Sequence, residues 1–99
     1  MSELHVVATI PAAPEHVDAI RAALETLVDA TRQEDGCLAY DLYESASAPG
    51  VFVTVERWTD QAALDAHMGT PHIAAAMAAA DGALAGDIAI HPLVPVVEG

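Results

Sequence analysis

Histidine is the side chain best suited to proton transfer near neutral pH, and two of the five histidines lie close together in the sequence. His67 and His72 are five residues apart with Pro71 between them. They therefore lack the i, i+4 spacing that places two zinc ligands on one helix face, and we expect no metal site on this pair. His67 is a candidate for acid–base chemistry, or for a structural hydrogen bond to Glu56.

A second group of chemically capable side chains lies on one predicted strand. The alternating residues 51–58 place Glu56 and Trp58 on the same strand face. Trp58 can stack on a flat aromatic ligand or pack in the core. Glu56 can orient His67, accept a proton, pair with an arginine or face water. Tyr40, on a neighbouring predicted strand, can offer its hydroxyl to a carbonyl oxygen or pack across the strands.

The elements that must position these residues follow from the hydrophobic pattern. Apolar, β-branched runs predict strands over residues 4–10, 37–45, 51–58 and 88–97, and prolines mark the last as an edge strand or a strand that leaves the sheet. Apolar residues at three- and four-residue steps predict a helix of about 20 residues that begins at Pro14 and ends at a left-handed Gly36. Asp60 and Thr70 are N-cap signals for two further helices.

This order of elements, β-α-β-β-α-β, predicts an α+β fold of the ferredoxin-like, split βαβ type. The chain of 99 residues then forms a single domain over 1–99, with a four-stranded antiparallel sheet and helices on one face. Several strands are apolar on both sides, and 54% of the residues are hydrophobic. We therefore expect a homodimer in which two sheets pack face to face.

Composition excludes several classes of partner. Three arginines and no lysine against 15 acidic residues give a net charge of −12, so neither nucleic acid nor an anionic membrane surface is an expected partner. The apolar content excludes a disordered chain. A single cysteine, Cys37, excludes an intrachain disulfide and a cysteine-based zinc site. The acidic start of the chain does not resemble a signal peptide, and we expect a cytoplasmic protein.

Three segments together resemble the antibiotic biosynthesis monooxygenase family, a family of small dimeric α/β proteins. The segments, in order, are Thr31–Tyr40 with the pattern E-x-G-C-x-x-Y, Phe52–Asp60 with E-x-W-x-D, and Ala63–His72 with A-L-x-x-H-x-x-T-x-H. The resemblance covers essentially the whole chain. It implies a ferredoxin-like fold that dimerises through its sheets into an α/β barrel, with a pocket between each sheet and its helices.

The resemblance also implies a chemistry. Family members include cofactor-independent monooxygenases that oxidise quinols or polyketide-type phenols with dioxygen. By this resemblance His67 is the candidate base, and their shared strand face makes Glu56 and Trp58 the other candidate catalytic residues. Removing the phenolic proton makes an electron-rich phenolate that itself reduces dioxygen, so no cofactor and no metal are expected. A non-catalytic dimer that binds a small molecule is the alternative.

The candidate substrate-binding residues are Thr9, Tyr40, Phe52, His72 and Met77. Met77 lies in an alanine-rich segment, which either forms a thin roof with an adaptable wall or is simply a good helix former. His5 and His91 could line either the pocket or the dimer face.

Two other branches of the family fit less well. Haem-degrading members have an asparagine on the first strand, and this chain contains no asparagine. Isomerases of a sugar phosphate need cationic groups to hold the phosphate, and the chain has only three arginines. A neutral, flat, weakly polar aromatic molecule is therefore the expected ligand.

Overall fold

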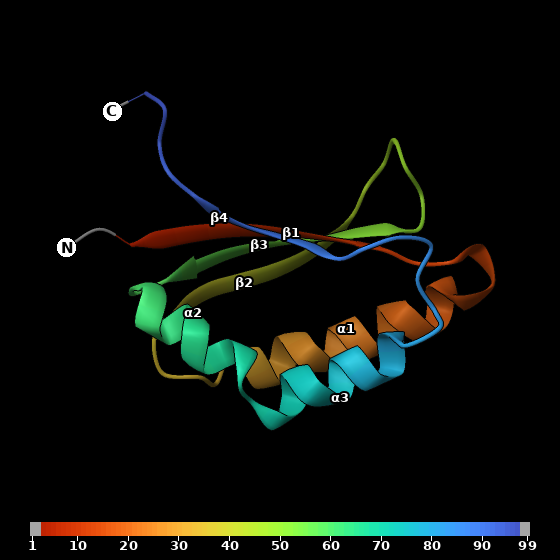
Figure 1. Cartoon of the computed structure of the whole chain (residues 1–99), viewed down its shortest axis with the longest axis horizontal. Coiled ribbons are helices and arrows are strands. Elements are labelled where there is room, and N and C mark those ends of the chain that lie inside the picture. The colour runs from red at the N-terminus through yellow and green to blue at the C-terminus, as the bar shows by residue number, and fades with distance from the viewer. Residues whose placement is uncertain (1–2, 98–99) are drawn as a thin grey trace.

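The computed structural model describes residues 3–97. The elements, in chain order, are β1 (Leu4–Pro11), the 3-10 turn η1 (Pro14–His16), α1 (Val17–Thr31), β2 (Cys37–Glu44), β3 (Val51–Trp58), α2 (Gln61–Met68), α3 (Pro71–Ala80) and β4 (Ala89–Leu93). The strands form one antiparallel sheet in the order β2-β3-β1-β4. All three α-helices lie against the same face of this sheet (Figure 1). The predicted ferredoxin-like, split βαβ fold is confirmed.

Two predicted boundaries were wrong in detail. The first helix is divided into η1 and a 15-residue α1 that ends at Thr31, so Gly36 lies in the following turn and is not the helix cap. The last strand covers only Ala89–Leu93; it includes Pro92, which an edge strand tolerates, and it ends before Pro95. As predicted, β4 is an edge strand, and it pairs with β1.

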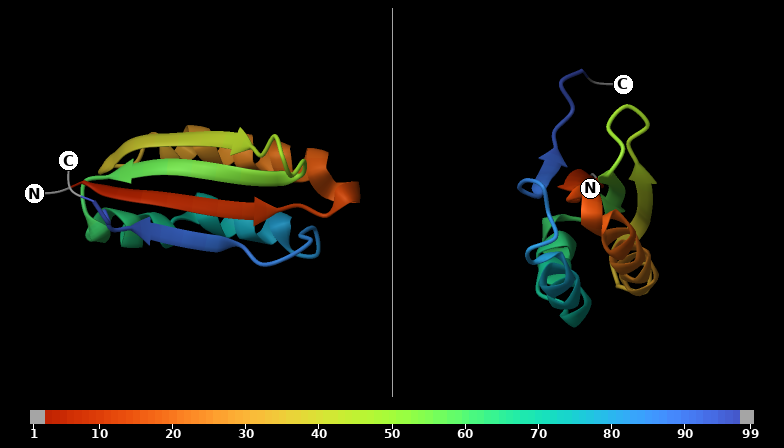
Figure 2. Two further views of the ribbon diagram at one scale, coloured as in Figure 1. Left: turned by 90° about the horizontal axis from the view of Figure 1, so that it is seen from above. Right: turned by 90° about the vertical axis from the view of Figure 1, so that its right-hand side faces the viewer.

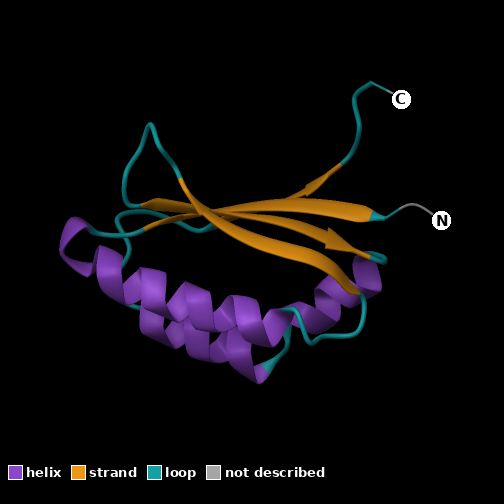
Figure 3. Cartoon of the chain, turned by 180° about the vertical axis from the view of Figure 1, so that it is seen from behind, coloured by secondary structure: helices purple, strands orange, loops and turns teal. Residues whose placement is uncertain are grey.

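The strand register determines which residues face the helices. In β1, Val6, Ala8 and Ile10 are buried under the helices, and they alternate with residues on the opposite, open face. Because directly paired residues share a face, the register assigns the neighbouring strands in the same way. The core therefore lies between the sheet and the helix layer. Figure 3 shows these two layers from behind.

The open face of the sheet is not covered by any described element, as the view from above shows (Figure 2). Three large apolar side chains on this face are substantially exposed: Tyr43 at 56%, Val55 at 43% and Leu93 at 45%. None of the described helices has the length and apolarity that crossing a bilayer requires.

The caps predicted for the second and third helices are present. The Asp60 carboxylate accepts a hydrogen bond from the Ala63 amide at 2.9 Å, and the Thr70 hydroxyl accepts one from the Ile73 amide at 3.3 Å. Between the two helices, Gly69 ends α2 and Pro71 begins α3. The chain thus changes direction just after His67.

We expect Gly36→Ala to destabilise the fold by about 2 kcal/mol or more, because two effects combine. Gly36 has a φ of +86°, and a Cβ there would lie 2.7 Å from the Ala63 Cβ on α2. Gly82→Ala is a matched control, since Gly82 has a φ of +75° but a Cβ added there would meet no atom within 4 Å. Urea denaturation measures both variants. Equal losses in the two would contradict the steric contribution at Gly36.

Candidate functional site

An apolar cavity lies between the sheet and the helices, with walls from every strand and all three α-helices. Its free space is about 60 Å³, small beside the roughly 300–1,000 Å³ of pockets that enclose drug-sized ligands. Four polar side chains reach its wall where β2, β3 and α2 meet; they are Tyr40, Thr54, Glu56 and His67. An apolar pocket with a few convergent polar groups is the usual form of a small-molecule site.

Glu56 is a buried carboxyl group with its own hydrogen-bond donors. It is 4% exposed, and it accepts hydrogen bonds from the Thr54 hydroxyl at 2.6 Å and the Trp58 indole N–H at 2.9 Å. These two donors compensate for the loss of water around the carboxyl group. Glu56 does not pair with an arginine, face water or orient His67, so these three expectations are corrected, while its place in the cavity wall leaves its expected role as a proton acceptor a prediction.

Trp58 supports the site from inside the core. Its side chain is fully buried, and the cavity wall formed by the described residues does not include it. Its ring lies 4.7 Å from the His67 ring, centroid to centroid, and packs edge-on to Tyr40 at 6.4 Å. A fully enclosed indole cannot stack on a ligand. Of the two predicted roles, Trp58 therefore has that of a core residue, and it makes no contact with the cavity.

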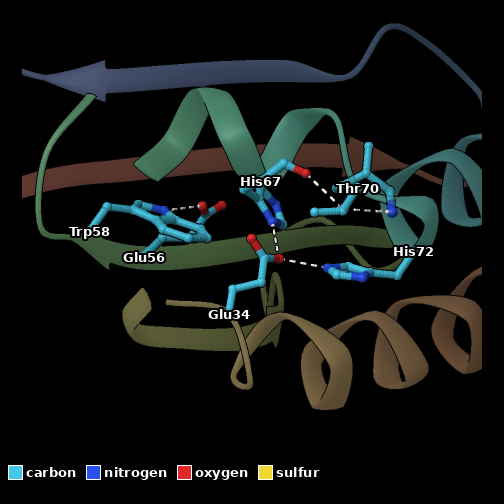
Figure 4. A network of polar contacts seen from close by, with 7 residues as sticks. Glu34, Glu56, Trp58, His67, Thr70 and His72 are labelled. Carbon is cyan, nitrogen blue, oxygen red and sulfur yellow. Dashed lines mark hydrogen bonds and ion pairs between the residues drawn. The ribbon is translucent and has the colours of Figure 1, made fainter. Parts of the chain in front are cut away.

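His67 lies at the wall of the cavity with its orientation determined by Glu34. It is 2% exposed, and its Nδ1 lies 2.6 Å from the Glu34 carboxylate (Figure 4). A neutral imidazole carries one N–H, and donating it to the carboxylate leaves the lone pair on Nε2. Among residues 3–97, the only side-chain hydrogen bond found for His67 is the one at Nδ1. The arrangement is that of a histidine base held in one tautomer by a carboxylate.

His72 shares the same carboxylate. Its Nε2 lies 2.6 Å from the Glu34 Oε2 that also contacts His67. The exposed fraction of the side chains rises from 3% for His67 through 12% for Glu34 to 25% for His72. The three residues therefore form a hydrogen-bonded chain from the cavity wall toward the surface.

Local structure explains how the chain brings these residues together. Glu34 lies in the turn after α1, where its amide donates to the Thr31 carbonyl at 3.0 Å. The Thr70 hydroxyl donates to the His67 carbonyl at 2.8 Å while it caps α3. Because the chain turns at this junction between α2 and α3, His72 lies next to His67. Sequence reasoning missed Glu34, although it stands in the first segment of the family pattern, because its partners lie 33 and 38 positions away.

The cluster of Glu34, His67 and His72 also offers one metal-ligand atom from each residue, and these atoms lie within 4.8 Å of one another. Two imidazole nitrogens and a carboxylate oxygen suit borderline divalent metals such as zinc. The sequence argument against a metal considered two ligands on one helix face, whereas these histidines lie on two helices, α2 and α3, and meet at Glu34.

The structure places only some of the predicted substrate-binding residues at the cavity. Tyr40 and Met77 line the cavity. His72 is not among the lining residues, and its Nε2 contacts the Glu34 carboxylate instead. Phe52 does not line the cavity: it is 2% exposed in the core, with the Arg21 guanidinium 5.4 Å from its ring centre. The prediction for Phe52 is therefore corrected.

The prediction that Thr9 binds substrate in the cavity is also corrected, because Thr9 lies on the open face of the sheet. It pairs with Val53 and Ala89, and it alternates with the buried Ala8 and Ile10. His5 and His91 share this open face by the same register, so neither lines the cavity. Both faces of β1 carry apolar residues, and the pattern alone could not tell which face the helices cover.

We expect the buried Tyr40 to lower the free energy of unfolding at alkaline pH. Burial, with the nearby charge of Glu56, raises the Tyr40 pKa well above its usual value of 10.0. Above about pH 10 the unfolded chain loses this proton while the folded chain keeps it, so stability falls by about 1.4 kcal/mol per pH unit. Denaturation from pH 8 to 11 should show a steeper loss in the wild type than in Tyr40→Phe. Tyr43→Phe, at an exposed tyrosine, should follow the wild type; parallel curves for all three would contradict the burial effect.

Comparisons with known proteins agree with this architecture. Residues 4–79 match the family described as antibiotic biosynthesis monooxygenase. The chain is 39% identical over 97 residues to "Putative monooxygenase Rv0793" of Mycobacterium tuberculosis, covering 98% of this chain and 95% of that protein. The solved structure of Rv0793 superposes with a TM-score of 0.88 and covers 98% of both chains. The structure of PA3566 from Pseudomonas aeruginosa, 34% identical, has a TM-score of 0.89 and covers 98% of this chain and 97% of that one. The chain belongs to the antibiotic biosynthesis monooxygenase family.

Proposed function

We propose that this protein is a cofactor-independent monooxygenase that oxidises a quinol or a polyketide-type phenol with dioxygen. The observation that carries the proposal is His67, which lines the cavity while its Nδ1 is held by Glu34 at 2.6 Å. With Nδ1 donating to Glu34, the lone pair of Nε2 is left to accept a proton. The membership of the family supports the reaction class.

The reaction balances without an external reductant. With an anthrone as substrate, His67 removes the phenolic proton of the enol form, and the resulting anion transfers one electron to dioxygen. The two radicals combine to form a carbon–oxygen bond, and the resulting peroxide anion takes the proton back from His67 to give a hydroperoxide. Breaking the oxygen–oxygen bond, with loss of the remaining hydrogen on that carbon, leaves a ketone and releases water. One oxygen atom enters the product, and the other leaves as water.

The cavity favours a neutral, flat substrate. Its walls carry no arginine or lysine, so they offer no charge partner to a phosphate or to haem propionates. The present free space of about 60 Å³ cannot hold two fused rings, so binding requires the wall to move. Met68 and Met77 line the cavity and are 38% and 40% exposed, and flexible methionine side chains can make room at low cost.

The proposed functional unit is a homodimer joined through the open faces of the sheets, which would cover Tyr43, Val55 and Leu93. We expect light scattering at micromolar concentration to give the dimer mass for the wild type. Val55→Asp should give a monomer, because a two-fold interface would bury the new charge on both copies. Ala75→Asp, which adds the same charge on exposed α3, should remain dimeric. A monomeric wild type would contradict this assembly.

The function is tested by oxygen uptake with a panel of dihydroxynaphthalenes and anthrones. We expect uptake that depends on protein concentration and persists after dialysis against a chelator. Melting temperatures measured with the same panel distinguish the alternative. Ligands that stabilise the protein without any oxygen uptake would instead indicate a non-catalytic binding protein.

A further inference from the structure

We propose that Glu34, His67 and His72 form a binding site for a divalent transition-metal ion of the zinc type, and that the bound ion switches off His67 as a base. The site itself depends only on the cluster of ligands. Its effect on activity rests on the proposed function.

The donor set is that of a zinc site. Zinc binds imidazole nitrogen and carboxylate oxygen at about 2.0–2.2 Å, so tetrahedral ligand atoms lie about 3.3 Å apart. The Glu34 Oε2 lies 2.6 Å from each histidine nitrogen and all three atoms lie within 4.8 Å of one another, so each oxygen–nitrogen pair must separate by about 0.7 Å and the two nitrogens must reach the same spacing to admit the ion. Glu34 lies in a turn, and the side chain of His72 is 25% exposed, so both can move. The exposed side also leaves room for water as the fourth ligand.

No cationic side chain competes for Glu34. The chain has no lysine, and its three arginines are engaged elsewhere: Arg21 with Asp18 and Glu44, Arg32 with Asp41, and Arg57 with Glu3. The net charge of −12 further attracts cations to the molecule. Glu34 is therefore an available carboxylate with two imidazoles already directed at it (Figure 4).

The ion would act on catalysis by changing the tautomer of His67. A nitrogen that binds a metal must present its lone pair, so coordination at Nδ1 moves the single ring proton of the neutral imidazole to Nε2. Nε2 then donates a hydrogen bond where it previously accepted a proton. The ion would lie on the Glu34 side of the ring, so it need not occupy the cavity.

Cobalt titration of the full chain, dialysed free of metal, tests the site. Co²⁺ replaces zinc and gives visible absorption whose intensity reports tetrahedral ligands. We expect one ion per chain, displaced by Zn²⁺, and binding weakened at least about tenfold in Glu34→Gln and in His72→Gln. His16→Gln removes an exposed histidine outside the cluster and should bind like the wild type. Binding that is absent at millimolar cobalt, or equal in all four proteins, would overturn the site.

Long-range proton–nitrogen NMR of the histidine rings tests the switch. Without metal, the His67 proton should be on Nδ1, and saturating Zn²⁺ should move it to Nε2. Oxygen uptake should fall as zinc fills the site and return with chelator. An unchanged His67 tautomer, or uptake that rises with zinc, would overturn the switch. If the protein shows no uptake at all, the proposed function fails, while the cobalt and NMR results still decide the metal site.

Discussion

Replacing His67 by alanine should lower the rate of substrate-dependent oxygen uptake by about 10²–10⁴-fold, the usual contribution of a positioned base. The loss should appear mainly in kcat, because the apolar wall that binds the substrate is otherwise intact. Raising the pH should restore part of the rate, since a phenolic substrate then ionises without the base. Oxygen-electrode kinetics across pH measure both effects.

His67 is buried, so its replacement must be separated from a loss of folding. His67→Gln keeps a side chain against Trp58 and should be equally inactive, while thermal unfolding confirms that it is folded. His16→Ala, at a partly exposed histidine, should retain the wild-type rate. A folded His67→Gln protein with the full wild-type rate would show that His67 is not the base.

Trp58→Ala should have the largest effect on stability, a loss of about 3–5 kcal/mol. The indole is fully buried between Tyr40 and His67, so truncation leaves a large cavity. It also removes the N–H that hydrogen-bonds Glu56 at 2.9 Å and leaves a buried carboxyl oxygen without that donor. A loss of this size is a large fraction of the roughly 5–15 kcal/mol that stabilises a typical domain.

Trp58→Phe separates the two contributions, because it keeps much of the ring but not the donor. It should be less destabilised than Trp58→Ala, and urea denaturation followed by circular dichroism measures the difference. Leu38→Ala, at a 44% exposed side chain, is the control and should cost much less. A Trp58→Ala protein as stable as the control would contradict the role of Trp58 as core.

The elements could be predicted from the sequence where the signal is local. Asp60 and Thr70 cap their helices through residues three positions ahead, so the cap signals were correct. The predicted end of the first helix was wrong, because the turn through Gly36 is shaped by its close contact with α2, which is distant in sequence. The alternation in β1 predicted a strand, but two apolar faces left the side of Thr9 undetermined.

The sequence allowed individual residues of the site to be predicted, but not the contacts between them. The family pattern directed attention to His67, but its partner was expected to be Glu56 on the adjacent strand and is Glu34 on a turn. The metal argument from the spacing of His67 and His72 considered only two ligands on one helix face, whereas the predicted junction at Thr70 brings histidines from two helices to one carboxylate. Contacts of this kind depend on tertiary packing, which no local pattern encodes.

Oxidation under isotopically labelled dioxygen tests the proposed reaction most directly. The chelator-dialysed wild type is incubated with an anthrone under ¹⁸O₂, and the quinone product is analysed by mass spectrometry. We predict one labelled oxygen atom in each product molecule, with the second label in water. Product that forms without label, or no product with any phenol of the panel, would contradict a monooxygenase reaction.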